Sequence, residues 1–162
     1  MKSISILALA AFVLSGPGCS RFVDYTGPEV TRVEVHKSSR SMTLWHHGEV
    51  LETFPVELGF DPLGHKMQEG DGRTPEGAYL IDRRNPDSEF YLSIGIDYPN
   101  ATDIAAAAEA GVDPGGDIFI HGTPRSFMRK DDWTAGCIAV TNREMRQIYA
   151  MVRDGTPITI HP

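Results

Sequence analysis

Turn-forming residues divide this sequence into short segments, and this division limits the fold more than any other feature. Eleven prolines and sixteen glycines are spread along 162 residues, which leaves few stretches long enough for an extended helix. Short apolar stretches between turns are typical of β-strands. The length fits one domain better than two. We therefore expect a single, mostly β domain with two or so helices, similar to a β-sandwich or barrel.

The expected strands are short runs of apolar or alternating residues. Val30, Val33 and Val35 begin the first run, and a turn at His47-Gly48 joins the next two. Residues 59–77 contain many turn formers and predict a long loop, which in a compact domain is often functional. The expected strands span residues 30–35, 41–46, 50–58, 78–82, 90–96, 117–120 and 157–160.

Two segments have the features of helices. Thr102–Ala110 is rich in alanine and is followed by Gly111, a favourable residue just after a helix. The second helix is expected to begin at Thr141, because Thr141 and Glu144 have the spacing of a capping box. Three apolar residues follow with helical spacing: Met145, Ile148 and Val152.

Residues 1–18 predict an export signal rather than part of the domain. Lys2 supplies one positive charge, residues 4–14 are nearly all apolar, and residues 15–18 are small or helix-breaking. The apolar run is too short for a stable membrane span. We therefore expect export to the periplasm or cell envelope.

Cys19 lies where bacterial lipoprotein signals place the cysteine that is cleaved and lipidated. Gly18 fits such signals, although Gly16 stands where they usually carry a larger aliphatic residue. The resemblance implies a mature chain that begins at Cys19 and contacts the membrane through its acyl chains alone. Residues 19–29 would then form a tether, and residues 30–162 the domain. The alternative is a secreted protein without a lipid.

The charge balance excludes one class of partner. The formal net charge is −7, and it becomes −8 once residues 1–18, with Lys2 as their one charged residue, are removed. Such an acidic protein is a poor candidate for general binding to nucleic acid or anionic lipid. Only two cysteines are present, and the histidines are scattered, so the paired spacing of a metal site is missing. We expect no metal, no cofactor and a monomer.

One thiol and one imidazole are the candidates for chemistry. Cys137 follows Gly136, and His121 ends an apolar run, so neighbouring strands can bring the two together. A thiol is nucleophilic as thiolate and needs a base, and imidazole titrates near neutrality. Gly136 leaves room for substrate and for amides that converge on an oxyanion. Taken alone, the pair leaves open that Cys137 is a small buried apolar residue.

Three motifs in order resemble those of YkuD-type L,D-transpeptidases. The phrase H-G-T at His121 is followed, after a spacer, by T-A-G-C at Cys137. Upstream, Gly70–Gly77 matches the family segment G-D-x-x-T-P-x-G. The resemblance extends from about Val30 to Ile160. Two positions depart from the family pattern, Ala135 and Ala139, and both make the acceptor and substrate preference open.

The resemblance implies roles for individual residues. Cys137 would be the nucleophile, His121 the general acid and base, and the Gly122 carbonyl would orient the imidazole. Thr134 and Gly136 would frame the substrate carbonyl, with backbone amides as oxyanion donors.

Cations in the loops around the site are the expected ligands of stem-peptide carboxylates. Lys66 and Arg73 are the preferred candidates because they lie in the matched loop motifs, although solvated surface charge is the alternative for each.

The implied activity is acyl transfer on peptidoglycan stem peptides. Release of D-alanine would leave a thioester on Cys137, which an amine of a second stem or of a protein then opens. Hydrolysis by the same pair, as in an L,D-carboxypeptidase or endopeptidase, is an alternative. The Cys137–Asn142 segment also resembles a branch whose enzymes release proteins from peptidoglycan. From another class, a noncatalytic wall-binding lipoprotein would have no need to keep both motifs.

Overall fold

The computed structural model describes residues 20–162, in which eight strands and two helices surround one core. The helices are α1 (Ala101–Ala110) and α2 (Asn142–Met151). The strands are β1 (Arg32–His36), β2 (Ser41–His46), β3 (Glu49–Pro55), β4 (Gly77–Asn85), β5 (Ser93–Ile96), β6 (Phe119–Gly122), β7 (Ile138–Val140) and β8 (Pro157–His161). The predicted class, mostly β with two helices, is confirmed. The predicted export signal and the lipidated Cys19 lie outside the described residues.

Two predicted strands are shorter than expected, for local reasons. The strand expected at 90–96 forms only over Ser93–Ile96, because Tyr91 has a φ of 81°, which is incompatible with extended backbone. The strand expected at 50–58 ends at Pro55. Beyond that point Glu57 makes an isolated antiparallel bridge with Ala139.

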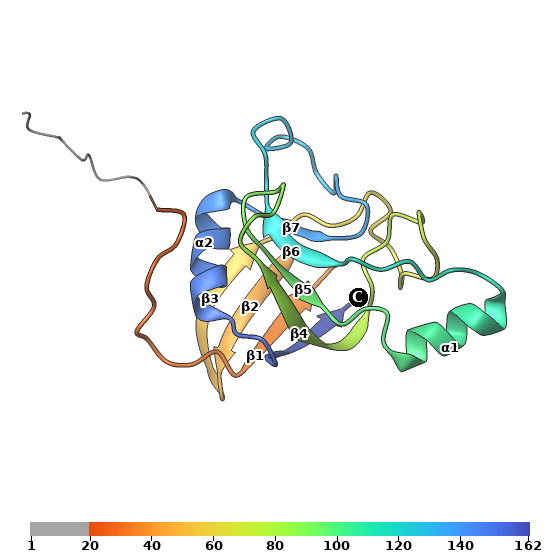
Figure 1. The fold of residues 1–162 in the computed structure, drawn as a ribbon, viewed down its shortest axis with the longest axis horizontal. Helices are drawn as coiled ribbons and strands as arrows, with labels where there is room; N and C mark the ends of the chain where they lie inside the picture. The colour runs from red at the N-terminus through yellow and green to blue at the C-terminus, as the bar shows by residue number, and fades with distance from the viewer. Residues whose placement is uncertain (1–19) are drawn as a thin grey trace, which may run out of the picture.

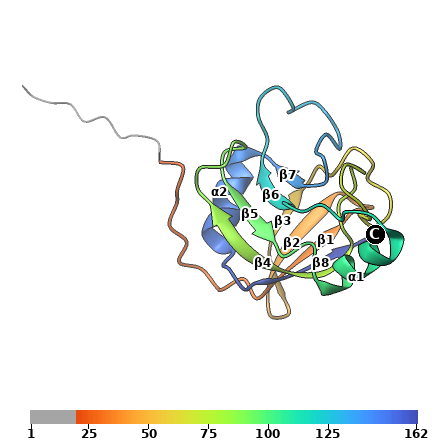
Figure 2. The same ribbon diagram turned by 45° about the vertical axis from the view of Figure 1, so that its right-hand side comes forward.

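The sheet is nearly closed into a barrel (Figures 1 and 2). Its strand order is β3-β2-β1-β8-β4-β5-β6-β7, with β8 parallel to β1 and antiparallel to β4. The two ends of this order meet where the main chains of Glu57 and Ala139 exchange two N–H···O bonds of 2.8 Å. This contact protects the outer edge of β7, which has only three residues.

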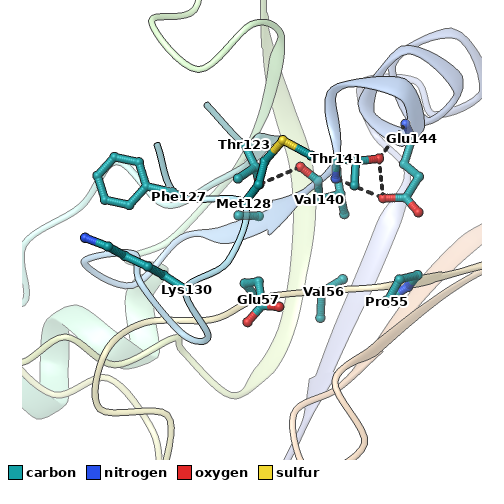
Figure 3. A pocket seen from close by; sticks show the side chains of 11 residues that line it. Pro55, Val56, Glu57, Thr123, Phe127, Met128, Lys130, Val140, Thr141 and Glu144 are labelled. Atoms are coloured by element: carbon teal, nitrogen blue, oxygen red, sulfur yellow. Dashed lines mark hydrogen bonds between the residues drawn. The ribbon is translucent and has the colours of Figure 1, made fainter. Parts of the chain in front are cut away.

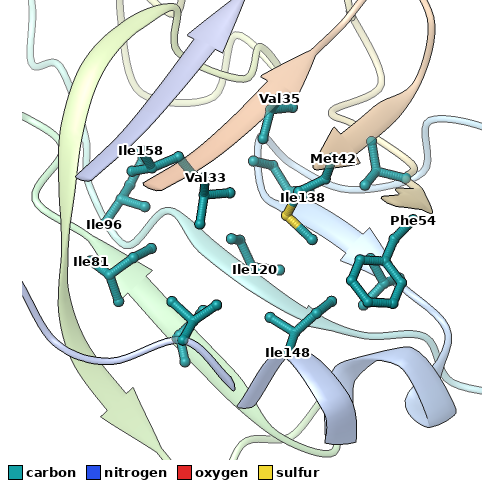
Figure 4. Packing of buried hydrophobic residues seen from close by; sticks show 14 of the residues in the cluster. Val33, Val35, Met42, Phe54, Ile81, Ile96, Ile120, Ile138, Ile148 and Ile158 are labelled. Atoms are coloured by element: carbon teal, nitrogen blue, oxygen red, sulfur yellow. The ribbon is translucent and has the colours of Figure 1, made fainter. Parts of the chain in front are cut away.

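The core fills the interior of this sheet (Figure 4). Ile120 of β6 and Ile138 of β7 lie opposite one another in register, and both are fully buried. Helix α2 covers β5 and β6 and contributes Ile148, together with other buried residues, from its apolar face. Burial of these side chains holds β6 and β7 side by side, with His121 and Cys137 next to the buried isoleucines.

Both helices begin with a capping box. Thr141 and Glu144 form the predicted box at α2, and Asn100 and Asp103 form another at α1. Gly111 ends α1 with a φ of 68°, as its position in the sequence predicts. Among residues 20–162, no helix has the length and apolar character needed to cross a membrane.

A buried lysine holds the long loop between β3 and β4. The Nζ of Lys37 donates to the carbonyls of Gly64 and Thr74, at 2.5 and 3.0 Å, and lies 2.8 Å from Glu76. Its side chain is only 3% exposed. All three acceptors belong to the predicted loop, so this one ammonium fixes the loop against β1.

We predict that Lys37→Ala lowers the free energy of unfolding by about 3 kcal/mol, because it leaves the buried Thr74 carbonyl, the partly buried Gly64 carbonyl and the partly buried Glu76 carboxylate without their donor. Urea unfolding measures the change. The matched control is Arg32→Ala, which removes a partly exposed ion pair with Glu34 and a contact with the Trp45 ring and should cost about 1 kcal/mol. Equal effects of the two variants would contradict the assignment.

Candidate active site

The parallel pairing of β6 and β7 brings the predicted imidazole and thiol into one hollow. His121 lies opposite Ala139 in the register, and Cys137 directly precedes β7. The hollow has a volume of about 250 Å³. It is lined by Asn85, Ser88, Glu89, Phe90, Ser93, Asp117, Phe119, His121 and Cys137.

Backbone and aromatic contacts fix the His121 ring. Its Nδ1 lies 2.8 Å from the Gly122 carbonyl oxygen. A carbonyl can only accept, so Nδ1 carries the hydrogen and the lone pair is on Nε2. Phe90 stacks on the ring at 4.6 Å between centroids, and Trp133 contacts it edge-on at 5.6 Å. Burial lowers the pKa of His121, partly opposed by the Gly122 carbonyl, and keeps the imidazole neutral.

Gly122 has no space for a side chain. A Cβ there would clash with the Asn142 Oδ1 and lie 2.8 Å from the Phe90 carbonyl oxygen. The Gly122 N–H donates to that same Phe90 carbonyl at 2.9 Å. The glycine therefore allows β6 to approach the Phe90 loop that covers His121.

The Cys137 thiol forms hydrogen bonds with main-chain groups of the segment before His121. It accepts from the Phe119 N–H at 3.4 Å and lies 3.5 Å from the Asp117 carbonyl oxygen, to which the thiol donates. Neither of these bonds involves His121. Burial raises the pKa of Cys137, and Asp117 adds to this, whereas the Phe119 N–H, Lys66 and Arg83 oppose it. The pair therefore rests as neutral thiol and neutral imidazole.

Thr134 and Gly136 shape the turn that presents Cys137. The buried Thr134 hydroxyl donates to the Cys137 carbonyl at 2.7 Å and accepts from the Gly136 N–H at 3.1 Å. Gly136 has a φ of 131°, and a Cβ there would lie 2.7 Å from the Arg73 carbonyl oxygen. The Gly136 amide is thus engaged within the turn, which leaves the amide of Cys137 as the candidate donor to an oxyanion.

The two predicted carboxylate-binding cations are paired inside the loop. Lys66 is 3% exposed and donates to Asp71 at 2.9 Å and to the Gln68 carbonyl at 3.0 Å. Burial alone would raise the pKa of Asp71, but hydrogen bonds from Lys66 and three backbone N–H groups lower it to about 2. Arg73 is more exposed and donates to Asp61 at 2.9 Å. Lys66 therefore stabilises the loop, and the Arg73 guanidinium is more accessible to a ligand than the Lys66 ammonium.

Three further residues shape the electrostatics of the hollow and were not singled out as site residues from the sequence: Arg83, Asp117 and Phe119. The Arg83 guanidinium lies 4.5 Å above the Phe119 ring, and one of its nitrogens is 3.5 Å from Asp117. Arg83 can lie flat there because Gly95 has no side chain: a Cβ would be 2.6 Å from the Arg83 Cγ. Phe119 and His121 are two residues apart, and residues two apart on a strand point to the same face of the sheet. This spacing could have placed Phe119 on the same face as His121 from the sequence alone.

A second hollow, of about 110 Å³, is lined by β7, residues 55–57 and the loop after β6 (Figure 3). Glu57, Met128 and the α2 capping pair are among its lining residues, and Thr123 donates to the Val140 carbonyl at 2.8 Å. It contains neither His121 nor Cys137, so the first hollow remains the candidate active site. Among residues 20–162, no group of three or more His, Cys, Asp or Glu side chains is arranged to hold a metal ion.

Comparison with known proteins identifies one family. The sequence model of the L,D-transpeptidase catalytic domain, YkuD, matches residues 30–160. The protein YafK of Escherichia coli (strain K12), provisionally named as an L,D-transpeptidase, is 30% identical over 126 residues, which are 74% of this chain and 46% of YafK.

Solved structures resemble the chain over most of its length. The helical cell shape determining protein Pgp2 of Campylobacter jejuni is 25% identical, with a TM-score of 0.66 over 88% of this chain and 51% of Pgp2. An L,D-transpeptidase of Mycobacterium smegmatis, at 17% identity, shares the fold with a TM-score of 0.57 over 82% of this chain and 59% of its own. The chain spans about half the length of YafK and Pgp2.

We predict that the rate of Cys137 alkylation by iodoacetamide keeps rising above pH 9.0, the ordinary value for a thiol, because burial disfavours the thiolate. The rate is measured by quenching the reaction at set times over a pH series and determining the alkylated fraction by intact-mass spectrometry. A plateau beginning below about pH 7 would mean a preformed thiolate–imidazolium pair instead.

Two variants shift this profile in opposite directions. Asp117→Asn removes a negative charge near the sulfur and should move the profile to lower pH, whereas Arg83→Gln removes a positive charge and should move it to higher pH. Shifts of the same sign in both variants would contradict the arrangement of charges described above.

Proposed function

Because this chain belongs to the YkuD family of L,D-transpeptidase catalytic domains, we propose that it is a peptidoglycan-modifying L,D-transpeptidase with Cys137 as nucleophile and His121 as general acid and base. One observation carries the proposal: the two groups line the same hollow, with His121 on β6 and Cys137 directly before the parallel strand β7. A noncatalytic wall-binding protein would have no use for this arrangement.

The first step forms a thioester. Nε2 of His121 takes the thiol proton as the Cys137 sulfur attacks the carbonyl carbon at the L-centre of the third stem residue. The oxyanion accepts from the Cys137 amide. The carbon–nitrogen bond then breaks, and the imidazolium gives its proton to the departing amine of D-alanine. Because thiol and imidazole both start neutral, charge develops only while substrate is bound.

The second step opens the thioester. An amine of a second stem attacks the thioester carbonyl, His121 accepts the proton of that amine, and the sulfur leaves and recovers a proton. The product is a new amide bond. Water in place of the amine gives the alternative, an L,D-carboxypeptidase or endopeptidase, and release of wall-attached protein uses the same steps on a different acyl donor.

We further propose that the protein acts in the cell envelope and is anchored there by a lipid on Cys19. The order of charged, apolar and small residues before Cys19 supports export. The similarity to Pgp2, a helical cell shape determining protein, supports a contribution to cell wall organisation.

We predict that Cys137→Ala abolishes the covalent adduct with purified tetrapeptide muropeptides and with a carbapenem while leaving the unfolding temperature nearly unchanged. Intact-mass spectrometry detects the adduct. The control is Met128→Ala, an exposed residue of the neighbouring hollow, which should retain it. An adduct on the Cys137→Ala protein would contradict the assignment.

The products decide between transfer and hydrolysis. Mass spectrometry of muropeptides incubated with the protein should show cross-linked dimers or D-alanine exchange if an amine opens the thioester. Shortened stems alone would select the hydrolytic alternative.

We predict that the acid limb of kcat/KM lies below pH 6.5, the ordinary histidine value, because burial lowers the pKa of His121 and catalysis needs its neutral form. The base is thus present at pH values where an exposed histidine would be half protonated. An acid limb above pH 6.5 would require a charged partner near the ring.

A further inference from the structure

A third hollow lies between the N-terminal segment and α2, away from the candidate active site. Its volume is about 490 Å³. Residues 22–26 form one wall, and Arg84, Arg146 and Arg153 contribute to the other. In Figure 1 this segment runs alongside α2, and the Phe22 and Tyr149 rings lie 6.1 Å apart.

The three arginines of this hollow carry more charge than its one acidic residue balances. Asp24 is the acidic residue in the lining, and within residues 20–162 neither Arg146 nor Arg153 takes part in an ion pair. Arg84 donates to the carbonyls of Tyr149 and Val152 at the end of α2. These bonds fix its position but leave its charge in the hollow.

The Arg146 side chain supplies a second, independent observation at this hollow. Its Nε is buried and has no hydrogen-bond partner in the described part of the chain. A buried unsatisfied donor in a native protein calls for a water or an ion. Arg146 lies on α2, Arg153 follows two residues after the end of the helix, and both line the hollow. Guanidinium groups bind phosphate oxygens, like carboxylates, through paired hydrogen bonds.

The position of the hollow along the chain indicates where the phosphate comes from. Phe22, in its wall, is three residues from Cys19, so the two Cα atoms are at most about 10 Å apart. Phe22 and Val23 are also 51% and 38% exposed. A lipid on Cys19 would therefore hold the hollow and two apolar side chains within about one Debye length of the lipid headgroups.

We propose that the Arg84–Arg146–Arg153 hollow binds the phosphate of an anionic phospholipid headgroup and so sets how the domain lies on its membrane. The proposal rests on the lipid anchor proposed above. It also refines the expectation from net charge. The acidic surface as a whole is repelled by anionic lipid, but a local basic hollow binds such a lipid at one face of the protein.

The test is flotation of residues 20–162, which contain both helices, all eight strands and the core, with vesicles at low ionic strength. We expect binding to vesicles that contain phosphatidylglycerol and none to phosphatidylcholine alone. Arg146→Glu with Arg153→Glu should reduce the bound fraction about tenfold or more, since each basic residue near such a surface contributes strongly. Arg125→Glu with Arg129→Glu makes the same charge change on a distant loop and should have little effect.

Several results would overturn the proposal. These are equal binding to both vesicle types, equal loss in the control pair, or no binding at all. Retention on peptidoglycan sacculi that is lost in Arg146→Glu with Arg153→Glu, without vesicle binding, would assign the hollow to wall carboxylates. Arg146→Ala with Arg153→Ala, checked by thermal unfolding, covers the case in which charge reversal disturbs folding. Muropeptide turnover by the same proteins without vesicles tests the enzymatic proposal separately.

Discussion

The parallel pairing of β6 with β7 is the constraint on which the candidate active site depends. Ile120 and Ile138 face each other in the core, and this places His121 opposite Ala139 with Cys137 one residue before β7. A slip of one residue would turn His121 into the core and Ile120 out of it. Because β7 is so short, the main-chain exchange between Glu57 and Ala139 on its other side is also needed to keep this register.

Burial then determines the protonation states of the two groups. It raises the pKa of the thiol and lowers that of the imidazole, so the site lacks the ion pair that would make the sulfur permanently nucleophilic. The Phe119 N–H and the nearby cations Lys66 and Arg83 partly oppose this for the sulfur. A resting neutral thiol reacts more slowly with alkylating and oxidising agents than a thiolate does.

The sequence was sufficient for features that depend on neighbouring residues. Thr141 and Glu144 predict the start of α2, and Gly111 predicts the end of α1, because capping is local. Features that depend on how a loop folds back on itself were not predictable in the same way. Lys66 and Arg73 look like free cations in the sequence, but their carboxylate partners Asp71 and Asp61 are identified only once the loop is folded.

Two glycines at the contact between the long loop and the Cys137 turn show a related difference. The sequence suggested that Gly136 leaves room for substrate, whereas in the folded chain its space is taken by the Arg73 carbonyl of the long loop. Gly59 is equally crowded: a Cβ there would meet the Gly72 carbonyl oxygen and lie 3.0 Å from the Gly136 Cα. These glycines let one backbone pack directly on another.

This backbone packing joins the long loop and the nucleophile turn into one unit. The Phe60 N–H donates to the Thr134 carbonyl and the Thr134 N–H to the Leu58 carbonyl, while the Gly59 N–H donates to the Thr74 hydroxyl. Lys37 and Lys66 supply the charges that hold the loop in this shape. Two motifs separated by some sixty residues in the sequence therefore serve one purpose, because the loop acts as the support that fixes the orientation of the Cys137 turn.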